Sequence, residues 1–278
     1  MPFGLAVAGD RVPVGLEIIP PIFVSHGLPS LALDAPAGSE LTAWAKSLPR
    51  PRGVLVISAH WQATTLSRGS TASRPRLLHD DQACGVAVGP EQCADLERLT
   101  WSAPGAPELA YELTELVAID RVDRGWDHGV FGPLVHMFPE ADIPVLQLSL
   151  VAGAAPRRLF GIGRKIGALA ARGYLVVGSG GITHNVAELD PRKDAPVADW
   201  ARAFDAWVAN LLADAEIDEL LAWRTKAPEA RRAHPTPEHL DPLFVVAGAA
   251  SLYEHAVGFP IRGFDHGTLS RRCVQFGR

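Results

Sequence analysis

Four short apolar runs, each bounded by glycine or proline, most constrain how this chain can fold. They are Pro21–Ser25, Gly53–Ser58, Pro144–Leu148 and Tyr174–Gly178. None of them alternates polar with apolar residues, which is typical of strands in a sheet that is covered on both faces. Segments with helical periodicity separate the runs. This alternation predicts an α/β fold with a mainly parallel central sheet flanked by helices.

The predicted helices are amphipathic or largely apolar segments between and after these strands. Ser39–Leu48 places its apolar side chains on one face, with Ser39 or Gly38 as the expected cap. The other predicted helices are Pro107–Leu116, Pro156–Arg172, Pro196–Leu212 and Pro237–Leu252. Arg68–Thr100 shows no clear period, and we expect a long loop there, where an active-site lid or substrate wall often lies.

Length and charge narrow the class of protein. The 278 residues are expected to form a loose N-terminal arm, residues 1–19, and a single domain, residues 20–278. A net charge of −5 argues against nucleic-acid binding, because nothing would offset phosphate repulsion. No apolar stretch reaches the roughly 20 residues of a membrane span, and the N-terminus lacks the basic region of a signal peptide.

The three cysteines point to a reducing compartment. Cys84, Cys93 and Cys273 are odd in number and have no C-x-x-C spacing. We therefore expect neither a disulfide nor a thiolate metal site, and a cytoplasmic location fits this pattern. The oligomeric state stays open, with a homo-oligomer as one alternative.

Three histidines follow the ends of predicted strands. His26 follows Pro21–Ser25, His60 follows Gly53–Ser58 after one alanine, and His184 follows Tyr174–Gly178 after a glycine-rich turn. Ligands of open α/β sheets bind beyond the carboxyl ends of the strands. If these strands are parallel neighbours, the three imidazoles meet at one edge. A single histidine in such a context is more often structural, but three at equivalent positions favour a site.

Five motifs, in order along the chain, carry a resemblance to a known family. They are Ser25-His26-Gly27-x-Pro29-Ser30, Ser58-Ala59-His60-Trp61, Trp126-Asp127-His128-Gly129, Gly178-Ser179-Gly180-Gly181-x-x-His184-Asn185 and Pro235-x-Pro237-Glu238-His239-Leu240-x-Pro242-Leu243. With these motifs the chain resembles the class III extradiol ring-cleavage dioxygenases, in their 4,5-DOPA dioxygenase-like branch. The resemblance covers about residues 21–277. The chain departs from the branch mainly within Asp80–Gln92, which predicts a different substrate.

The resemblance implies a role for each of five histidines. It implies that His26, His60 and His239 hold one Fe(II) or Zn(II) ion per chain, with His239 in place of the glutamate of the broader class and Glu238 beside it. His184 and His128 are implied to transfer protons. By their position in the chain, His79 and His234 are weaker candidates for substrate contact at the edge of the site, and a surface role for His79 is an equal alternative.

The chemistry of the residues agrees with this implication. Neutral imidazole suits iron and zinc, and three ligands on one face leave positions open for a catechol and for dioxygen. Removing protons from the ring hydroxyls near neutral pH suits histidine. We therefore expect extradiol cleavage of a small catechol-type ring by O2. Two alternatives remain open: a zinc-dependent hydrolase that uses the same histidines, and a non-catalytic zinc-binding module in which His184 is a fourth ligand.

Overall fold

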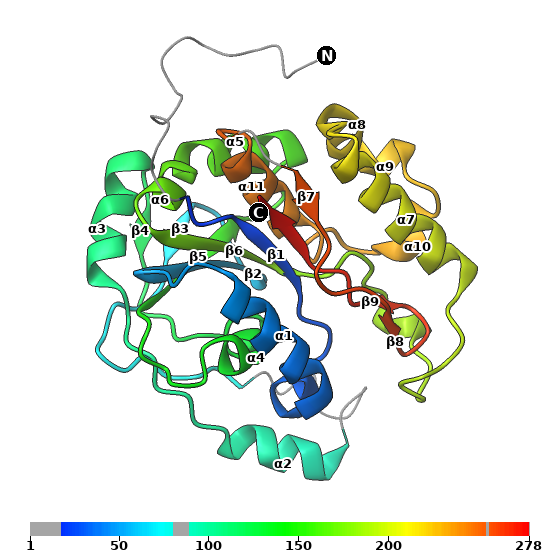
Figure 1. The fold of residues 1–278 in the computed structure, drawn as a ribbon, viewed down its shortest axis with the longest axis horizontal. Coiled ribbons are helices and arrows are strands. Elements are labelled where there is room, and N and C mark those ends of the chain that lie inside the picture. The colour runs from blue at the N-terminus through cyan, green and yellow to red at the C-terminus, as the bar shows by residue number, and fades with distance from the viewer. Residues whose placement is uncertain (1–17, 80–88, 254–255, 278) are drawn as a thin grey trace.

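The four predicted strands lie side by side at the centre of an eight-stranded sheet. The computed structural model describes residues 18–79, 89–253 and 256–277 (Figure 1). The sheet has the order β4-β3-β5-β2-β6-β1-β10-β7. Its strands are β1 Ile22–Ser25, β2 Gly53–Ala63, β3 Ser67–Arg68, β4 Asp120–Arg121, β5 Val145–Val151, β6 Tyr174–Gly180, β7 Val257–Gly258 and β10 Val274–Phe276; β8 Phe264–Asp265 and β9 Leu269–Ser270 form a separate hairpin. Most of the predicted N-terminal arm lies outside the described residues.

The prediction of a mainly parallel sheet is confirmed. β5, β2, β6 and β1 run parallel, whereas β10 and β7 add an antiparallel edge. Ser25 pairs with Gly180, and Ser58 pairs with Ser179. The carboxyl ends of β1, β2 and β6 therefore meet at one edge of the sheet, as the positions of the histidines required.

β2 is longer than predicted, and His60 lies within it rather than beyond its end. The strand continues to Ala63, and its register against β5 shifts between Ile57 and Gln62. A bulge of this kind bends a strand and redirects its side chains, and bulges are common beside active sites. The prediction that the strand ends at Ser58 is wrong. The apolar run stops there, but the strand continues past the bulge, and the sequence pattern does not reveal a change of register.

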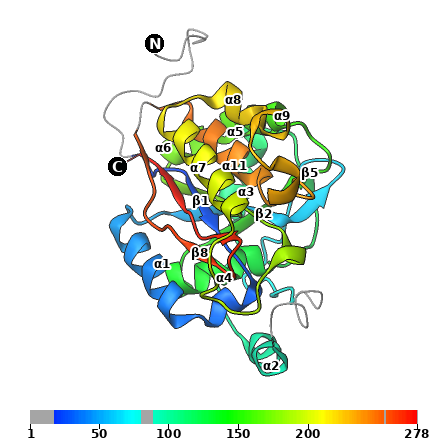
Figure 2. The ribbon, with the colours of Figure 1, turned by 90° about the vertical axis from the view of Figure 1, so that its right-hand side faces the viewer.

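The helices cover both faces of the sheet (Figures 1 and 2). They are α1 Ala35–Ser47, α2 Pro90–Arg98, α3 Pro107–Leu116, α4 His128–Met137, α5 Pro156–Ile166, α6 Ala168–Ala171, α7 Asp199–Ala213, α8 Ile217–Leu221, α9 Trp223–Lys226, α10 Ala230–Ala233 and α11 Asp241–Ala250, with 3-10 turns η1 Pro29–Leu33 and η2 Val186–Glu188. Successive strand residues face opposite layers: Phe23 packs with α3, α5, α7 and α11, whereas Ile22 and Val24 pack with α1 and α4. Both faces are thus buried, which explains the uninterrupted apolar runs.

Several predicted helix boundaries differ from the structure. α1 begins four residues earlier than expected, because the Asp34 side chain accepts a hydrogen bond from the N–H of Ala37 at 3.1 Å and caps the helix. The predicted helix Pro156–Arg172 is divided between α5 and α6 at Gly167. Two further predicted helices are shorter at their N-terminal ends, where α7 begins at Asp199 and α11 at Asp241.

Five helices occupy segments in which no helix was predicted: α2, α4 and the short α8, α9 and α10. α2 lies within Arg68–Thr100, so the prediction of one long loop is wrong for that part. α4 begins at His128 and is buried along almost its whole length. Its glycines and Pro133 obscure the helical pattern, and a helix that is buried on all sides has no polar face to reveal its period.

The cysteine prediction is also corrected. Cys93 is disulfide-bonded, whereas Cys273 is a free, buried thiol; Cys84 lies outside the described residues. An odd number of cysteines does not exclude one pair, so the cysteine pattern no longer argues for a reducing compartment. No helix in the described ranges has the length and apolarity that crossing a bilayer requires.

Candidate metal centre

Three imidazoles from separate parts of the chain converge at the carboxyl edge of the sheet. His26 follows β1, His60 lies at the β2 bulge, and His239 lies two residues before α11. One potential ligand atom from each lies within 4.8 Å of the others. The Nε2 atoms of His26 and His60 are 3.0 Å apart. With metal–nitrogen bonds of about 2.0–2.1 Å, two adjacent ligands on one ion lie about 3 Å apart, so this spacing fits a metal.

His239 presents one free nitrogen to this centre. Its Nδ1 lies 3.2 Å from Oε1 of Glu238, and its Nε2 is buried without a hydrogen-bond partner. A buried, unpartnered nitrogen is costly unless an ion or solvent satisfies it. The backbone brings His239 close to β6: the N–H of Gly181 donates to the His239 carbonyl at 2.8 Å, and a Cβ at Gly180 would collide with that carbonyl.

A buried hydrogen-bond network supports His60. The Ser58 hydroxyl accepts from the backbone N–H of His60 at 3.2 Å and donates to Asp127 at 2.7 Å. Arg124 donates to the His60 carbonyl at 3.1 Å and to Asp127 at 3.0 Å, and Gln147 donates to Asp127 at 2.5 Å. Because Ser58, Arg124 and Gln147 all donate to the Asp127 carboxylate, this network stabilises the bulge that carries His60.

Burial keeps two of the three imidazoles, those of His26 and His239, neutral. Burial, and next the charge that neighbouring histidines would carry, lower the pKa of His26 and of His239 well below the ordinary value. Neutral imidazole is the form that binds a metal, and three nitrogens without a carboxylate suit iron, zinc and other first-row metals. The residues present therefore fit a metal ion.

Two further histidines lie against the triad. The ring centroid of His128, the first residue of α4, is 3.9 Å from that of His60. The ring of His184 stacks on His239 at 3.4 Å with an interplanar angle of 4°. Burial, and then the charge that His234 and His60 would carry, lower the pKa of His184 to about 4. Burial also lowers the pKa of His128 well below its ordinary value.

The two remaining candidates lie elsewhere. His234 is buried, its Nε2 donates to the Ile182 carbonyl at 2.9 Å, and its ring packs between Phe204 and Trp223. These contacts connect it to the turn before His184 and are typical of a supporting residue. His79 lies on an exposed segment with its ring 5.7 Å from that of Phe131. The structure thus brings together five of the seven predicted histidines.

The residues that support the ligands were not singled out from the sequence. Ser58, Asp127 and Ser179 each lie within five residues of a predicted histidine in the quoted motifs, so their closeness to those histidines was the only signal. Arg124 and Gln147 gave no signal, because only the fold brings them to Asp127.

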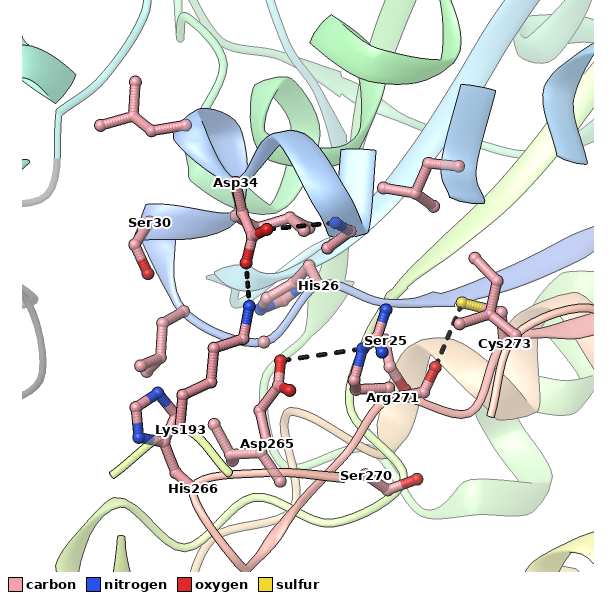
Figure 3. A pocket seen from close by; sticks show the side chains of 18 of the residues that line it. Ser25, His26, Ser30, Asp34, Lys193, Asp265, His266, Ser270, Arg271 and Cys273 are labelled. Carbon is pink, nitrogen blue, oxygen red and sulfur yellow. Dashed lines mark hydrogen bonds and ion pairs between the residues drawn. The ribbon is translucent and has the colours of Figure 1, made fainter. Parts of the chain in front are cut away.

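A cavity of about 350 Å³ opens beside His26, between η1 and the β8–β9 hairpin. Its floor includes Leu31, Leu41 and Leu269. Charged pairs line its walls: Asp34 bonds to Lys193, and Asp265 lies 3.7 Å from Arg271 (Figure 3). Burial opposes ionisation of Asp34, but hydrogen bonds from Lys193 and from Ala37 hold its pKa below the ordinary value. The cavity can therefore take a small ligand that has an apolar body and a charged group.

The buried histidines predict that the metal-free protein loses stability in acid. In the unfolded chain histidine titrates near pH 6.5, whereas the folded-state pKa values of His184 and His234 are about 4. Between these values the unfolded state binds more protons, so the free energy of unfolding falls as pH falls from about 6.5 towards 4. A tenfold difference in proton affinity between the two states corresponds to about 1.4 kcal/mol per group.

Urea denaturation of chelator-treated protein between pH 7.5 and 4.5 measures this effect. A free energy of unfolding that stays constant over that range would show that these histidines are not buried as neutral groups.

Comparisons with known proteins agree with the geometry. Residues 32–268 match the family model described as the catalytic LigB subunit of aromatic ring-opening dioxygenase. The chain is 35% identical to a 4,5-DOPA dioxygenase extradiol of Portulaca grandiflora, over 91% of this chain and 94% of that protein. It is 34% identical to a 4,5-DOPA dioxygenase extradiol of Escherichia coli K12, over 93% and 95% of the two chains.

A solved structure shares the fold. The crystal structure of an uncharacterised protein of Escherichia coli K12 superposes with a TM-score of 0.74 and 28% identity, covering 93% of this chain and all of that chain. The similarity thus extends over both layers of helices and the sheet between them.

Proposed function

Since the chain belongs to the family of the catalytic LigB subunit of aromatic ring-opening dioxygenases, and is a class III extradiol dioxygenase of the DOPA dioxygenase-like kind, we propose that it cleaves a small catechol with O2. Both oxygen atoms enter the product, so one O2 is consumed for each ring opened. The convergence of three imidazoles, with two more against them, is the observation that carries this proposal.

His26, His60 and His239 would hold one Fe(II) or Zn(II) ion per chain. When bound, the ion would supply a Lewis acid for the oxygens of the two adjacent hydroxyl groups of the catechol. Fe(II) would in addition supply an electron donor for O2. The parallel stacking of His184 on His239 supports a site with three protein ligands, and His184 is not in the group whose nitrogens converge among the described residues. This leaves positions open for substrate, unlike a closed structural zinc site.

His184 and His128 are proposed to handle protons. Both are neutral at pH 7, because burial depresses their pKa values. A neutral imidazole can accept a proton from a ring hydroxyl and return it as the ring opens. Their rings lie against different histidines of the triad: His184 stacks on His239, and His128 lies against His60. The substrate would then have one proton acceptor on each side.

The cavity beside His26 is proposed to receive the substituent of the catechol ring. Its apolar floor and its two charged pairs favour a side chain that ends in charged groups, such as that of DOPA, the compound in the names of several relatives. Lys193 and Arg271 would bind a carboxylate, whereas Asp34 and Asp265 would bind an ammonium group.

The test is oxygen uptake by the Fe(II)-loaded protein with a panel of catechols. We expect one O2 per catechol, a yellow semialdehyde-type product, and lower KM values for catechols with charged side chains than for unsubstituted catechol. The control is an equal concentration of free Fe(II). No uptake above that control, together with hydrolysis of ester or amide substrates by the zinc-loaded protein, would replace this proposal with a zinc hydrolase.

A further inference from the structure

Ser179 joins a metal-ligand candidate to helix α4 through one hydroxyl group. Its Oγ lies 2.9 Å from Nδ1 of His26 and 2.5 Å from the carbonyl oxygen of Gly129. The side chain is completely buried in β6, so no solvent competes for these two contacts. Their directions can therefore be assigned from the donors and acceptors alone.

The Gly129 carbonyl is an acceptor that lacks its usual helical partner. In an α-helix the carbonyl of residue 129 would accept from the N–H of residue 133, which is Pro133 and has no N–H. The proline inside α4 thus leaves the carbonyl available to the Ser179 hydroxyl. A carbonyl cannot donate, so the single hydroxyl proton of Ser179 points at Gly129.

The same proton cannot also point at His26. Ser179 Oγ must then accept from Nδ1, which means that Nδ1 of His26 carries the imidazole proton. A neutral imidazole has one such proton, so the lone pair lies on Nε2, the atom 3.0 Å from Nε2 of His60. The lone pair therefore faces the metal centre.

We propose that Ser179 is a positioning residue, which fixes His26 in the Nδ1–H tautomer and holds its ring so that Nε2 is presented to the metal. The inference builds on the metal site of the proposed function, but it concerns metal binding and not the reaction. Partners of this kind typically change metal affinity by 10–100-fold when they are removed.

The experiment compares metal affinity in Ser179→Ala, Ser179→Thr and Ser149→Ala. Ser149 is a matched control: it is a buried strand serine whose Oγ accepts from the N–H of Ser67 at 2.9 Å and lies 3.4 Å from the Thr65 carbonyl, and no histidine contact is found for it in the described part of the chain. Zn(II) and Co(II) dissociation constants are measured by chelator competition, and urea denaturation of the metal-free proteins reports folding.

We expect Ser179→Ala to weaken binding of both metals by about 10–100-fold and to alter the Co(II) absorption spectrum. Ser179→Thr, which keeps the hydroxyl, should restore most of the affinity, and Ser149→Ala should bind as the parent does. Long-range ¹⁵N–¹H correlation spectra of the metal-free parent should show His26 protonated at Nδ1, and Ser179→Ala should populate the other tautomer.

Metal affinity of Ser179→Ala within twofold of the parent would overturn the proposal, as would an equal loss in Ser149→Ala or a parent His26 protonated at Nε2. If Ser179→Ala does not fold, Ser179→Cys decides, because a thiol keeps the volume but is a weak acceptor. Unchanged affinity in that variant also overturns the proposal. Loss of ring cleavage with intact metal binding in the parent would instead contradict the proposed function alone.

Discussion

Alanine in place of His26, His60 or His239 is expected to reduce bound metal from about one ion per chain to almost none, and to abolish ring cleavage. Each residue supplies one of the three nitrogens that converge within 4.8 Å. Two imidazoles hold a divalent ion far less tightly than three, and no carboxylate belongs to the converging group in the described ranges. Elemental analysis of the purified variants measures the loss, and circular dichroism shows that they fold.

Glu238→Gln is the matched control for His239→Ala. The carboxylate of Glu238 contacts Nδ1 of His239, on the side of the ring away from the free Nε2. A glutamine oxygen can keep this contact, so the variant should retain its metal. Full metal occupancy in His239→Ala, combined with loss in Glu238→Gln, would make Glu238 the third ligand, as in the broader class.

His184→Ala is expected to keep its metal and to lose about 10²–10⁴-fold in kcat, the usual contribution of a general acid–base residue. The ring stacks on His239 without belonging to the converging group, and its pKa of about 4 leaves it unprotonated at pH 7, with a free lone pair. A loss of this size corresponds to about 3–5 kcal/mol of transition-state stabilisation. Metal analysis and steady-state oxygen uptake are measured on the same preparations.

His128→Ala is the companion variant. Because its ring lies 3.9 Å from His60, we expect retained metal with a higher KM for catechol or for O2. If His184→Ala loses its metal, His184 is a fourth ligand and the site resembles a closed zinc centre. If it keeps both metal and full activity, proton transfer takes place elsewhere.

The sequence predicted the centre of the fold because burial on both faces leaves a clear mark. The runs around Val24, Ile57 and Val177 show no alternation of polar and apolar residues for a physical reason: helices cover both sides of each strand. Burial also explains why α4 was not predicted. A helix without a solvent-facing side has no polar stripe that would reveal its period. The sequence pattern also missed the capping role of Asp34, which depends on a single hydrogen bond to Ala37.

Three of the histidines at the site could be found from the pattern of the chain, but the residues that support them could not. His26, His60 and His184 follow or interrupt apolar strands, and parallel pairing then brings them to one edge. The assignment of His239 as a metal ligand, and of His184 and His128 to proton transfer, came from resemblance to a family. Ser179 belongs to a glycine-rich motif, and nothing in the pattern indicated its contact with His26.

What the sequence determined by itself was therefore a covered parallel sheet with histidines at its carboxyl edge, because strand burial and strand ends depend on local composition. Only the tertiary structure decided which nitrogen of His26 faces the centre. That choice depends on a partner distant in sequence, since Ser179 lies 153 residues from His26. The protonated nitrogen of a buried imidazole follows from the acceptor beside it, and packing alone supplies that acceptor.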